Sequence, residues 1–199
     1  MKIKIINSFH GIFVIPLIVL FMVLSSCSGK QQNAHNEPPT RQDSVAALKA
    51  PSIDIFTAAL FGDLKAINYY IKSGADLDQK DQYGSSPLII ATIFGKTDVT
   101  KALIDAGADP DLQNGDGSTA LFCAAFFCRT EIVKALIDNG ADKSIKNKSG
   151  ATALESVSGP FKDVKGIYDQ FSKSLGPLGL KLDYERIEKT RPVIAEMLK

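Results

Sequence analysis

The side chains that could do chemistry are few in this chain of 199 residues, and they form no catalytic constellation. One of the two histidines, His10, lies close to the N-terminus. The other, His35, lies in a polar stretch broken by prolines, where a lone histidine is ordinarily only solvated. No glycine-rich phosphate loop of the P-loop or dinucleotide type is present. We therefore expect a protein that is not an enzyme and that carries no cofactor.

The cysteines and aspartates do not match the spacing of a metal or redox site. Cys123 and Cys128 lack zinc or redox spacing, and helical residues five apart have Cα atoms beyond the ~7 Å that a disulfide allows. Cys128 stands at the position that Gly62 and Gly95 occupy in the two preceding copies of the repeat described below, so the helix can end before it. We therefore expect buried free thiols, with a disulfide between Cys123 and Cys128 as the alternative. The acidic positions fail the calcium-loop spacing, so we predict no metal site; they are Asp76, Asp78, Asp81, Asp109, Asp111 and Asp116.

The chain is organised by near-copies of one stretch, which recur with a period of 33. Each copy carries a glycine in a turn and a second glycine followed by Ala-Asp. An alanine and a phenylalanine also recur at the same interval. Self-similarity at this period is typical of stacked helical repeats. The repeated positions are Gly84, Gly117 and Gly150; Gly74, Gly107 and Gly140; Ala58, Ala91 and Ala124; and Phe61, Phe94 and Phe127.

Each copy predicts a turn followed by two short helices. Within residues 81–113, Ser86 can cap a helix and Pro87 suits the first helical position, where its missing N–H costs nothing. The second helix carries an apolar stripe from Val99 to Ala106, and Gly107 ends it. Neither helix can bury its apolar face alone, so stacking on neighbouring copies must supply the core.

This pattern resembles the ankyrin repeat. Ser86-Pro87-Leu88-Ile89-Ile90-Ala91 matches that family's Thr-Pro-Leu-His-x-Ala element, and Thr119 to Ala124 and Thr152 to Leu154 repeat it with losses. The histidine of the family is absent throughout. The resemblance implies an all-α solenoid of about four helix–turn–helix repeats, at about 51–80, 81–113, 114–146 and 147–199. The residues that replace the histidine are Ile89, Phe122 and Glu155.

The fourth repeat is interrupted at Ser158-Gly159-Pro160. Val193 to Lys199 resembles Ile132 to Ile137 at an offset of 61, which is one period of 33 and a further 28. We therefore expect a helical insertion at about 158–191, followed by a final helix that completes the repeat and has Pro192 near its first turn. The insertion should hold an amphipathic helix, an apolar loop and a short helix. Either it emerges on the binding face, or it caps the open end of the stack.

Positions 1–26 are predicted to be a signal peptide. Lys2 and Lys4 precede an apolar run from Ile12 to Leu24, which is shorter than the ~20 residues of a membrane span. Leu24-Ser25-Ser26-Cys27 is similar to the lipobox of bacterial lipoproteins. That resemblance implies cleavage before Cys27, lipid on its thiol and acylation of the new amine, which together would anchor the protein. An ordinary secretory signal and an uncleaved anchor are the alternatives.

Residues 27–50 are polar and broken by Pro38-Pro39, so we predict a flexible linker between the lipidated cysteine and a repeat domain at 51–199. Ser28 is not aspartate, which by the enterobacterial pattern implies passage to the outer membrane, and we expect the domain to face the periplasm as a monomer. Removal of Lys2 and Lys4 from the 23 basic residues leaves 21 against 22 acidic ones. This balance does not indicate nucleic acid as a partner.

The resemblance implies that a protein partner binds the concave face, through turn tips and the ends of the first helices. Phe61, Phe94 and Phe127 would form an aromatic stripe there. Alternatively, the stripe packs under the insertion or against neighbouring helices. Two other classes of function are a structural spacer, with all three phenylalanines covered, and a small-molecule or catalytic module on the insertion, with an acid such as Asp183 or Glu185. The candidate partner-binding residues are Leu60, Phe61, Gln82, Tyr83, Ser85, Ile93, Phe94, Asp116, Ser118, Phe126, Phe127, Lys148 and Ser149.

Overall fold

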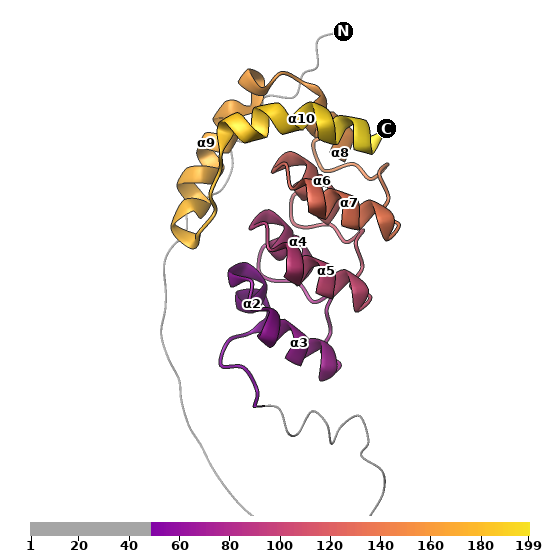
Figure 1. Cartoon of the computed structure of the whole chain (residues 1–199), viewed down its shortest axis with the longest axis vertical. Coiled ribbons are helices and arrows are strands. Elements are labelled where there is room, and N and C mark those ends of the chain that lie inside the picture. Colours follow the sequence, from indigo (N-terminus) through magenta and orange to yellow (C-terminus); the bar gives the residue numbers. More distant parts are fainter. Residues whose placement is uncertain (1–48) are drawn as a thin grey trace, which may run out of the picture.

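The computed structural model describes residues 49–199, and every regular element in that range is helical (Figure 1). The predicted all-α solenoid is confirmed. The predicted signal peptide, Cys27 and nearly all of the predicted linker lie outside the described residues. Within residues 49–199, no helix combines the length and the apolar character that crossing a membrane would need.

The helices come in stacked pairs. Each of the first three pairs has a shorter inner helix followed by a longer outer helix, and the fourth pair is split by the insertion. The elements are α2 (Ile55–Phe61), α3 (Leu64–Lys72), α4 (Pro87–Ile93), α5 (Thr97–Asp105), α6 (Ala120–Phe126), α7 (Thr130–Asp138), α8 (Ala153–Ser158), α9 (Phe161–Leu175), the 3-10 helix η1 (Gly176–Leu178) and α10 (Tyr184–Leu198).

Each inner helix begins at the same kind of cap. The side-chain oxygen of the capping residue accepts a hydrogen bond from the main-chain N–H three residues later, which satisfies a donor that the first turn leaves open. Thr152 is the strongest case, because Glu155 also reaches back to the Thr152 N–H at 2.7 Å and closes a capping box. The caps are Asp54, Ser86, Thr119 and Thr152.

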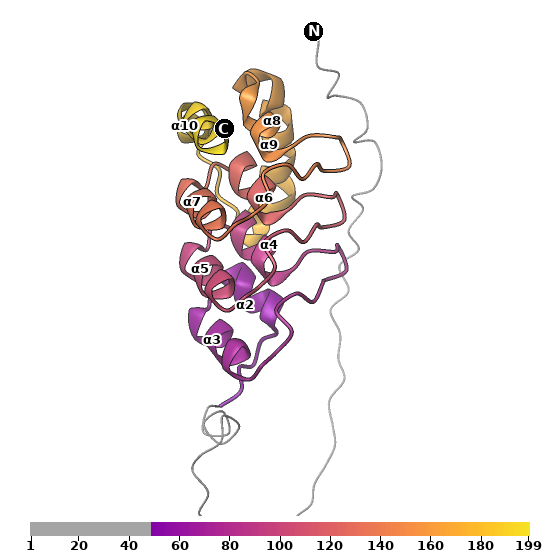
Figure 2. The same cartoon turned by 90° about the vertical axis from the view of Figure 1, so that its right-hand side faces the viewer.

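The turns between repeats project as fingers from one side of the stack, which Figure 2 shows in profile. In the second repeat, Asp81 Oδ1 accepts the N–H groups of Tyr83 and Ser85, at 2.8 Å each. Successive fingers are joined through their backbones, since the Gly115 N–H donates to the Tyr83 carbonyl at 2.9 Å. Gly84, with φ +74°, must be small here, because a Cβ would lie 2.9 Å from the Gly115 nitrogen.

The core lies between the two layers of helices and between successive repeats. Inner helices α2, α4, α6 and α8 pack on one another in order, and outer helices α3, α5 and α7 do the same. Ala58, Ala91 and Ala124 are fully buried at equivalent positions, and their small side chains allow this close approach. The repeats therefore share one continuous core.

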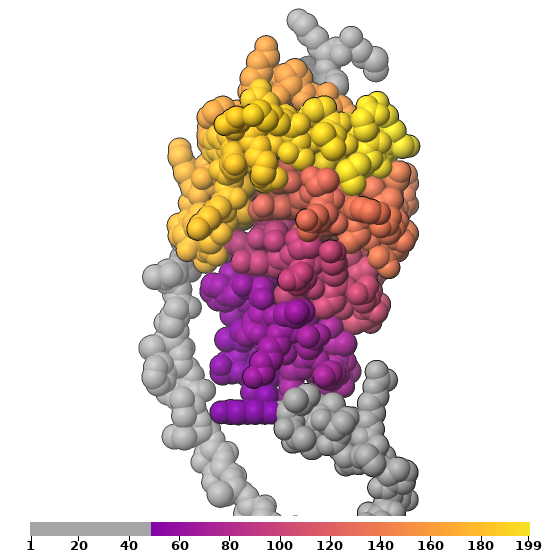
Figure 3. Space-filling model, in the orientation of Figure 1, coloured from indigo at the N-terminus to yellow at the C-terminus, as the bar shows by residue number. Residues whose placement is uncertain are grey.

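The insertion is one long helix and a short 3-10 turn, and the last helix then returns to the stack. α10 packs on α8 and α7, so it lies where the outer helix of a fourth repeat would lie. The repeat boundaries themselves remain predictions. In Figure 3 the insertion and α10 cover the C-terminal end of the stack and reach down one side, while the first repeat is left uncovered.

The predicted break near Pro192 is wrong. The sequence predicts a short helix at the end of the insertion and a separate final helix, but α10 is continuous from Tyr184 to Leu198 with Pro192 inside it. Proline lacks an N–H, so the Glu188 carbonyl loses its helical partner. Both Pro192 and Glu188 are exposed, so water can satisfy that carbonyl, and the helix continues through the proline.

Candidate partner-binding face

The finger tips are held by turns that the sequence repeats. Asp81 has equivalents in Asn114 and Asn147, whose side chains accept two main-chain N–H groups each, at 2.9–3.1 Å. The five predicted tip residues that lie exposed are Gln82, Tyr83, Asp116, Lys148 and Ser149.

Two predicted finger residues are not on the surface. Ser85 and Ser118 are each 7% exposed, and their N–H groups bond to the Asp81 and Asn114 side chains. They lie inside the turn rather than on its tip. The expectation that they meet a partner is therefore corrected: they shape the finger and do not present a side chain.

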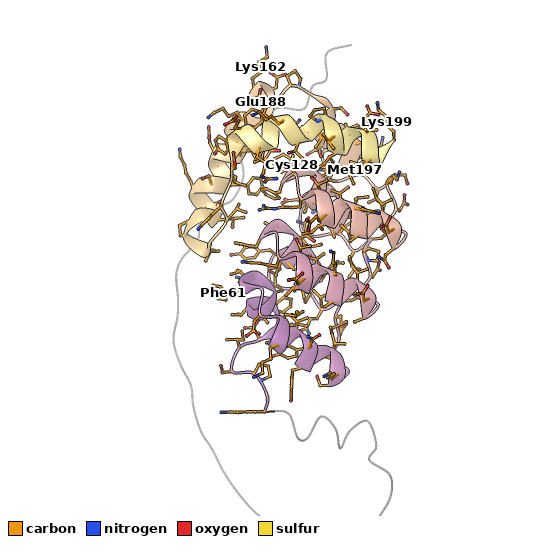
Figure 4. All side chains as sticks on the ribbon, in the orientation of Figure 1. Phe61, Cys128, Lys162, Glu188, Met197 and Lys199 are labelled. Carbon is orange, nitrogen blue, oxygen red and sulfur yellow. The ribbon has the colours of Figure 1, made fainter. Side chains whose placement is uncertain are left out.

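The three phenylalanines of the stripe, here called the aromatic column (Phe61, Phe94 and Phe127), lie at equivalent positions but differ in exposure. Phe61 is 65% exposed, Phe94 is half-buried and Phe127 is 2% exposed. Leu60 and Ile93 beside the column are also half-buried. Figure 4 shows Phe61 projecting from the same side of the stack along which α9 descends. The column is therefore open at its N-terminal end and closed at its C-terminal end.

Helix α9 closes the column. The ring of Phe127 packs edge-on against Phe171, with centroids 5.2 Å apart, and Phe126 stacks on Tyr168 at 4.5 Å. Phe126 is 8% exposed and Tyr168 is fully buried. The prediction that Phe126 and Phe127 are open to a partner is therefore corrected, and the alternative that they pack under the insertion describes them.

Hydrogen bonds hold the insertion on this face. The Tyr168 hydroxyl donates to the Phe126 carbonyl and accepts from Arg191 Nη1 at 3.2 Å. Arg191 Nη2 also donates to the Gly159 carbonyl at 3.0 Å, which fixes the start of the insertion. Tyr184 donates to Asp169 at 2.9 Å, and this bond, with Lys165 beside it, lowers the pKa of the Asp169 carboxyl. The insertion is thus bonded to α6, α10 and itself.

A set of cations that the sequence reasoning missed runs beside the aromatic column. We call Lys96, Arg129 and Arg186 the cation row. A Cβ on Gly62 would lie 2.9 Å from Lys96 Cδ, and a Cβ on Gly95 would lie 2.9 Å from Arg129 Cζ. The Lys96 side chain therefore lies over Gly62, which follows Phe61. The Arg129 side chain lies over Gly95, which follows Phe94.

Two hydrogen bonds fix the arginines of the cation row. Arg129 Nη2 donates to the Ile93 carbonyl at 3.2 Å, and Arg186 Nη1 donates to the Cys128 carbonyl at 2.8 Å. Lys96 and Arg129 are 33 residues apart, which is one period, so the repeat pattern could have indicated them. Arg186 comes from α10, and no repeat pattern indicates it.

Cys123 and Cys128, the two cysteines in the described part of the chain, are free and buried, as first expected. Burial raises the pKa of Cys123 to about 12 and that of Cys128 to about 11, so neither is a thiolate nucleophile at neutral pH. Cys128 has φ +53° at the position where Gly62 and Gly95 also have positive φ. The disulfide alternative does not describe the structure.

Two of the predicted turn acids bond to the backbone of the next repeat: Asp78 Oδ1 accepts the Asp109 N–H at 2.9 Å, and Asp111 Oδ1 accepts the Asp142 N–H at 2.8 Å. Among residues 49–199 no group of three or more metal-ligating side chains comes together. Asp78 and Asp111 thus join one repeat to the next.

The family comparison addresses the repeats directly. Residues 55–147 match the family model of ankyrin repeats (3 copies). The repeats within residues 55–147 are ankyrin repeats. They are three of the four helix pairs described above, and proteins of this kind generally mediate protein–protein interaction. No curated protein matches the chain.

Proposed function

We propose that this protein is a lipid-anchored component of a bacterial cell envelope, and that it binds another protein on the uncovered part of its concave ankyrin face. The observation that carries the binding proposal is the exposure of Phe61, at 65%, beside half-buried Phe94. Large apolar side chains on a concave surface are what a partner's side chains pack against. The finger tips, with Gln82 and Tyr83, would supply the polar rim.

The anchor proposal is supported by the sequence alone. Leu24 to Cys27 has lipobox character after a basic start and a short apolar run. Lipid on Cys27 would tether the repeats to the membrane, with residues 28–50 as the connection. An outer-membrane location facing the periplasm, and a monomeric state, complete the proposal. Binding at this place would scaffold, sequester or inhibit the partner.

Two other classes of function are less well supported. A catalytic or small-molecule module on the insertion would need free acidic groups, but Asp183 caps α10 through the Arg186 N–H at 3.0 Å and Glu185 pairs with Lys189 at 2.6 Å. A spacer would have the whole aromatic column covered, and Phe61 is not. We therefore retain protein binding.

Capture of partners from detergent-solubilised envelopes tests the binding proposal. The full-length protein is compared with a Phe61→Ser/Phe94→Ser variant, and Val193→Ser is the matched control because Val193 is also exposed, at 53%, but lies on α10. Circular dichroism establishes that each variant folds. A protein captured by wild type and control, and lost with the double variant, supports the proposal. Identical capture by all three contradicts it.

Metabolic labelling tests the anchor separately. Cells that express the protein are fed an alkyne fatty acid, and the purified protein is examined for the label. We expect label on the wild type and none on Cys27→Ser, which should also keep the higher mass of the uncleaved chain. Equal labelling of the two would show that Cys27 is not the lipid site.

A further inference from the structure

We propose that the segment bound on the open part of the aromatic column is an acidic amphipathic helix of a protein partner. Its apolar side chains contact Phe61 and Phe94, and its carboxylates contact Lys96, Arg129 and Arg186. This inference rests on the proposed function and adds the chemistry of the partner.

The first step is the unpaired charge of the cation row. Among the described residues, Lys96, Arg129 and Arg186 have no carboxylate within 4.0 Å, and the four ion pairs present there all involve other lysines. The hydrogen bonds of the two arginines go to main-chain carbonyls, which satisfy donors but carry no charge. Positive charge is therefore concentrated beside the aromatic column without an internal counter-charge.

The second step is the desolvation of Arg129. Its guanidinium is half-buried, and Nε has no hydrogen-bond partner in the described part of the chain. Burial, and after it the nearby Arg186 charge, lower the pKa of Arg129. A carboxylate placed beside the two guanidiniums would neutralise this repulsion, and charge-assisted hydrogen bonds to guanidinium groups are among the stronger ones. An acidic side chain is thus the complementary group.

The third step is the geometry of the occupant. The covered end of the column is occupied by a helix, since α9 lays Tyr168 and Phe171 on Phe126 and Phe127. Packed helices lie about 8–10 Å apart, so equivalent positions on successive inner helices are about 10 Å apart along this face. Seven residues of helix rise about 10.5 Å. A partner helix with an acid at every seventh position would meet successive members of the cation row.

A lipid surface is the competing anionic occupant. Exposed phenylalanine beside cations also suits a membrane of anionic lipids. However, Phe94 and Arg129 are half-buried, whereas a flat bilayer contacts side chains that project fully from the surface. Their partial burial therefore favours a protein segment, whose side chains can follow an uneven surface.

Selection from a displayed library of helical peptides tests the inference. The peptides have leucine on one face and randomised residues beside it, and they are selected on the full-length protein in detergent. We expect acidic residues to be enriched at a spacing of seven. Lys96→Gln/Arg186→Gln should weaken the selected peptides at least tenfold, and high salt should weaken them too. Lys101→Gln/Lys134→Gln, two exposed outer-helix lysines, is the control and should leave binding unchanged.

The outcomes separate this inference from the proposed function. Selected peptides without acidic enrichment, or with affinity unchanged in Lys96→Gln/Arg186→Gln, overturn the acidic helix. If those same peptides are lost with Phe61→Ser/Phe94→Ser, protein binding on the column still stands. Failure to select any helical peptide also overturns the inference, as does binding to phosphatidylglycerol vesicles that depends on the cation row.

Discussion

The Tyr168 hydroxyl donates a hydrogen bond to the main-chain carbonyl of Phe126, while the rings of the two residues stack with centroids 4.5 Å apart. One side chain thus attaches the insertion to the third repeat in two ways. The Phe126 carbonyl is at the end of α6, so no N–H of a later turn of that helix donates to it. The covering of Phe126 and Phe127 depends on this contact.

Removal of the hydroxyl should destabilise the protein. Tyr168→Phe leaves the Phe126 carbonyl and Arg191 Nη1 without their partner in a buried place. We expect the free energy of unfolding to fall by about 1–3 kcal/mol. Denaturant unfolding followed by circular dichroism measures it. Tyr69→Phe is the control, because Tyr69 is half-buried on α3 and far from the insertion in sequence. Equal effects in the two variants would show that the Tyr168 bond contributes nothing special.

Replacement of Arg191 by an apolar residue should stabilise the fold. Arg191 is 3% exposed, its Nε has no partner and no carboxylate lies within 4.0 Å among residues 49–199. Burial of a charge without a counter-charge is costly, so we expect Arg191→Met to raise the free energy of unfolding by about 1 kcal/mol or more. Lys189→Met on the exposed face of α10 should change it by less than about 0.5 kcal/mol. A clear loss of stability in Arg191→Met would contradict the prediction.

Replacement of the buried Cys128 by glycine should cost less stability than its burial alone would predict. Its φ of +53° is strained for a residue with a Cβ, by roughly 1–2 kcal/mol. We expect Cys128→Gly to be at least as stable as Cys128→Ala. Cys123 lies inside α6, where glycine costs about 1 kcal/mol relative to alanine. Thermal unfolding of Cys128→Gly, Cys128→Ala, Cys123→Gly and Cys123→Ala measures the cost of glycine relative to alanine at each position. An equal cost at both positions would rule out strain at Cys128.

The capping box of α8 should make stability depend on pH. Hydrogen bonds from the Thr152 main-chain N–H and then its hydroxyl lower the pKa of Glu155 in the folded chain below its ordinary value of 4.5. A lowered folded-state pKa stabilises the fold above about pH 4.5, and this contribution is lost as pH falls through the lowered pKa. Glu155→Gln should therefore lose less stability than wild type between about pH 5 and pH 3. Glu131→Gln, an exposed first-turn residue of α7, serves as control and should follow the wild-type profile.

The local structure could be predicted from the sequence, because its causes lie within a few residues. The period of 33, the caps such as Ser86 and Thr152 and the glycines with positive φ each act on the turn or helix that contains them. The insertion helix is also predictable, from its own apolar stripe. The prediction misplaces Pro192 because local preference puts proline in a first turn, whereas an exposed helix face can carry it further along.

Only the tertiary structure decided what is exposed. Phe61 and Phe127 occupy the same position of the repeat, but one is 65% and the other 2% exposed. An amphipathic helix has an apolar face, and its sequence does not say which surface that face will meet. The contacts of α9 with Phe126 and Phe127, and the approach of Arg186 to Cys128, join residues that are far apart in the sequence. Such contacts follow from how the insertion folds back onto the stack, and no repeat period or local propensity carries that information.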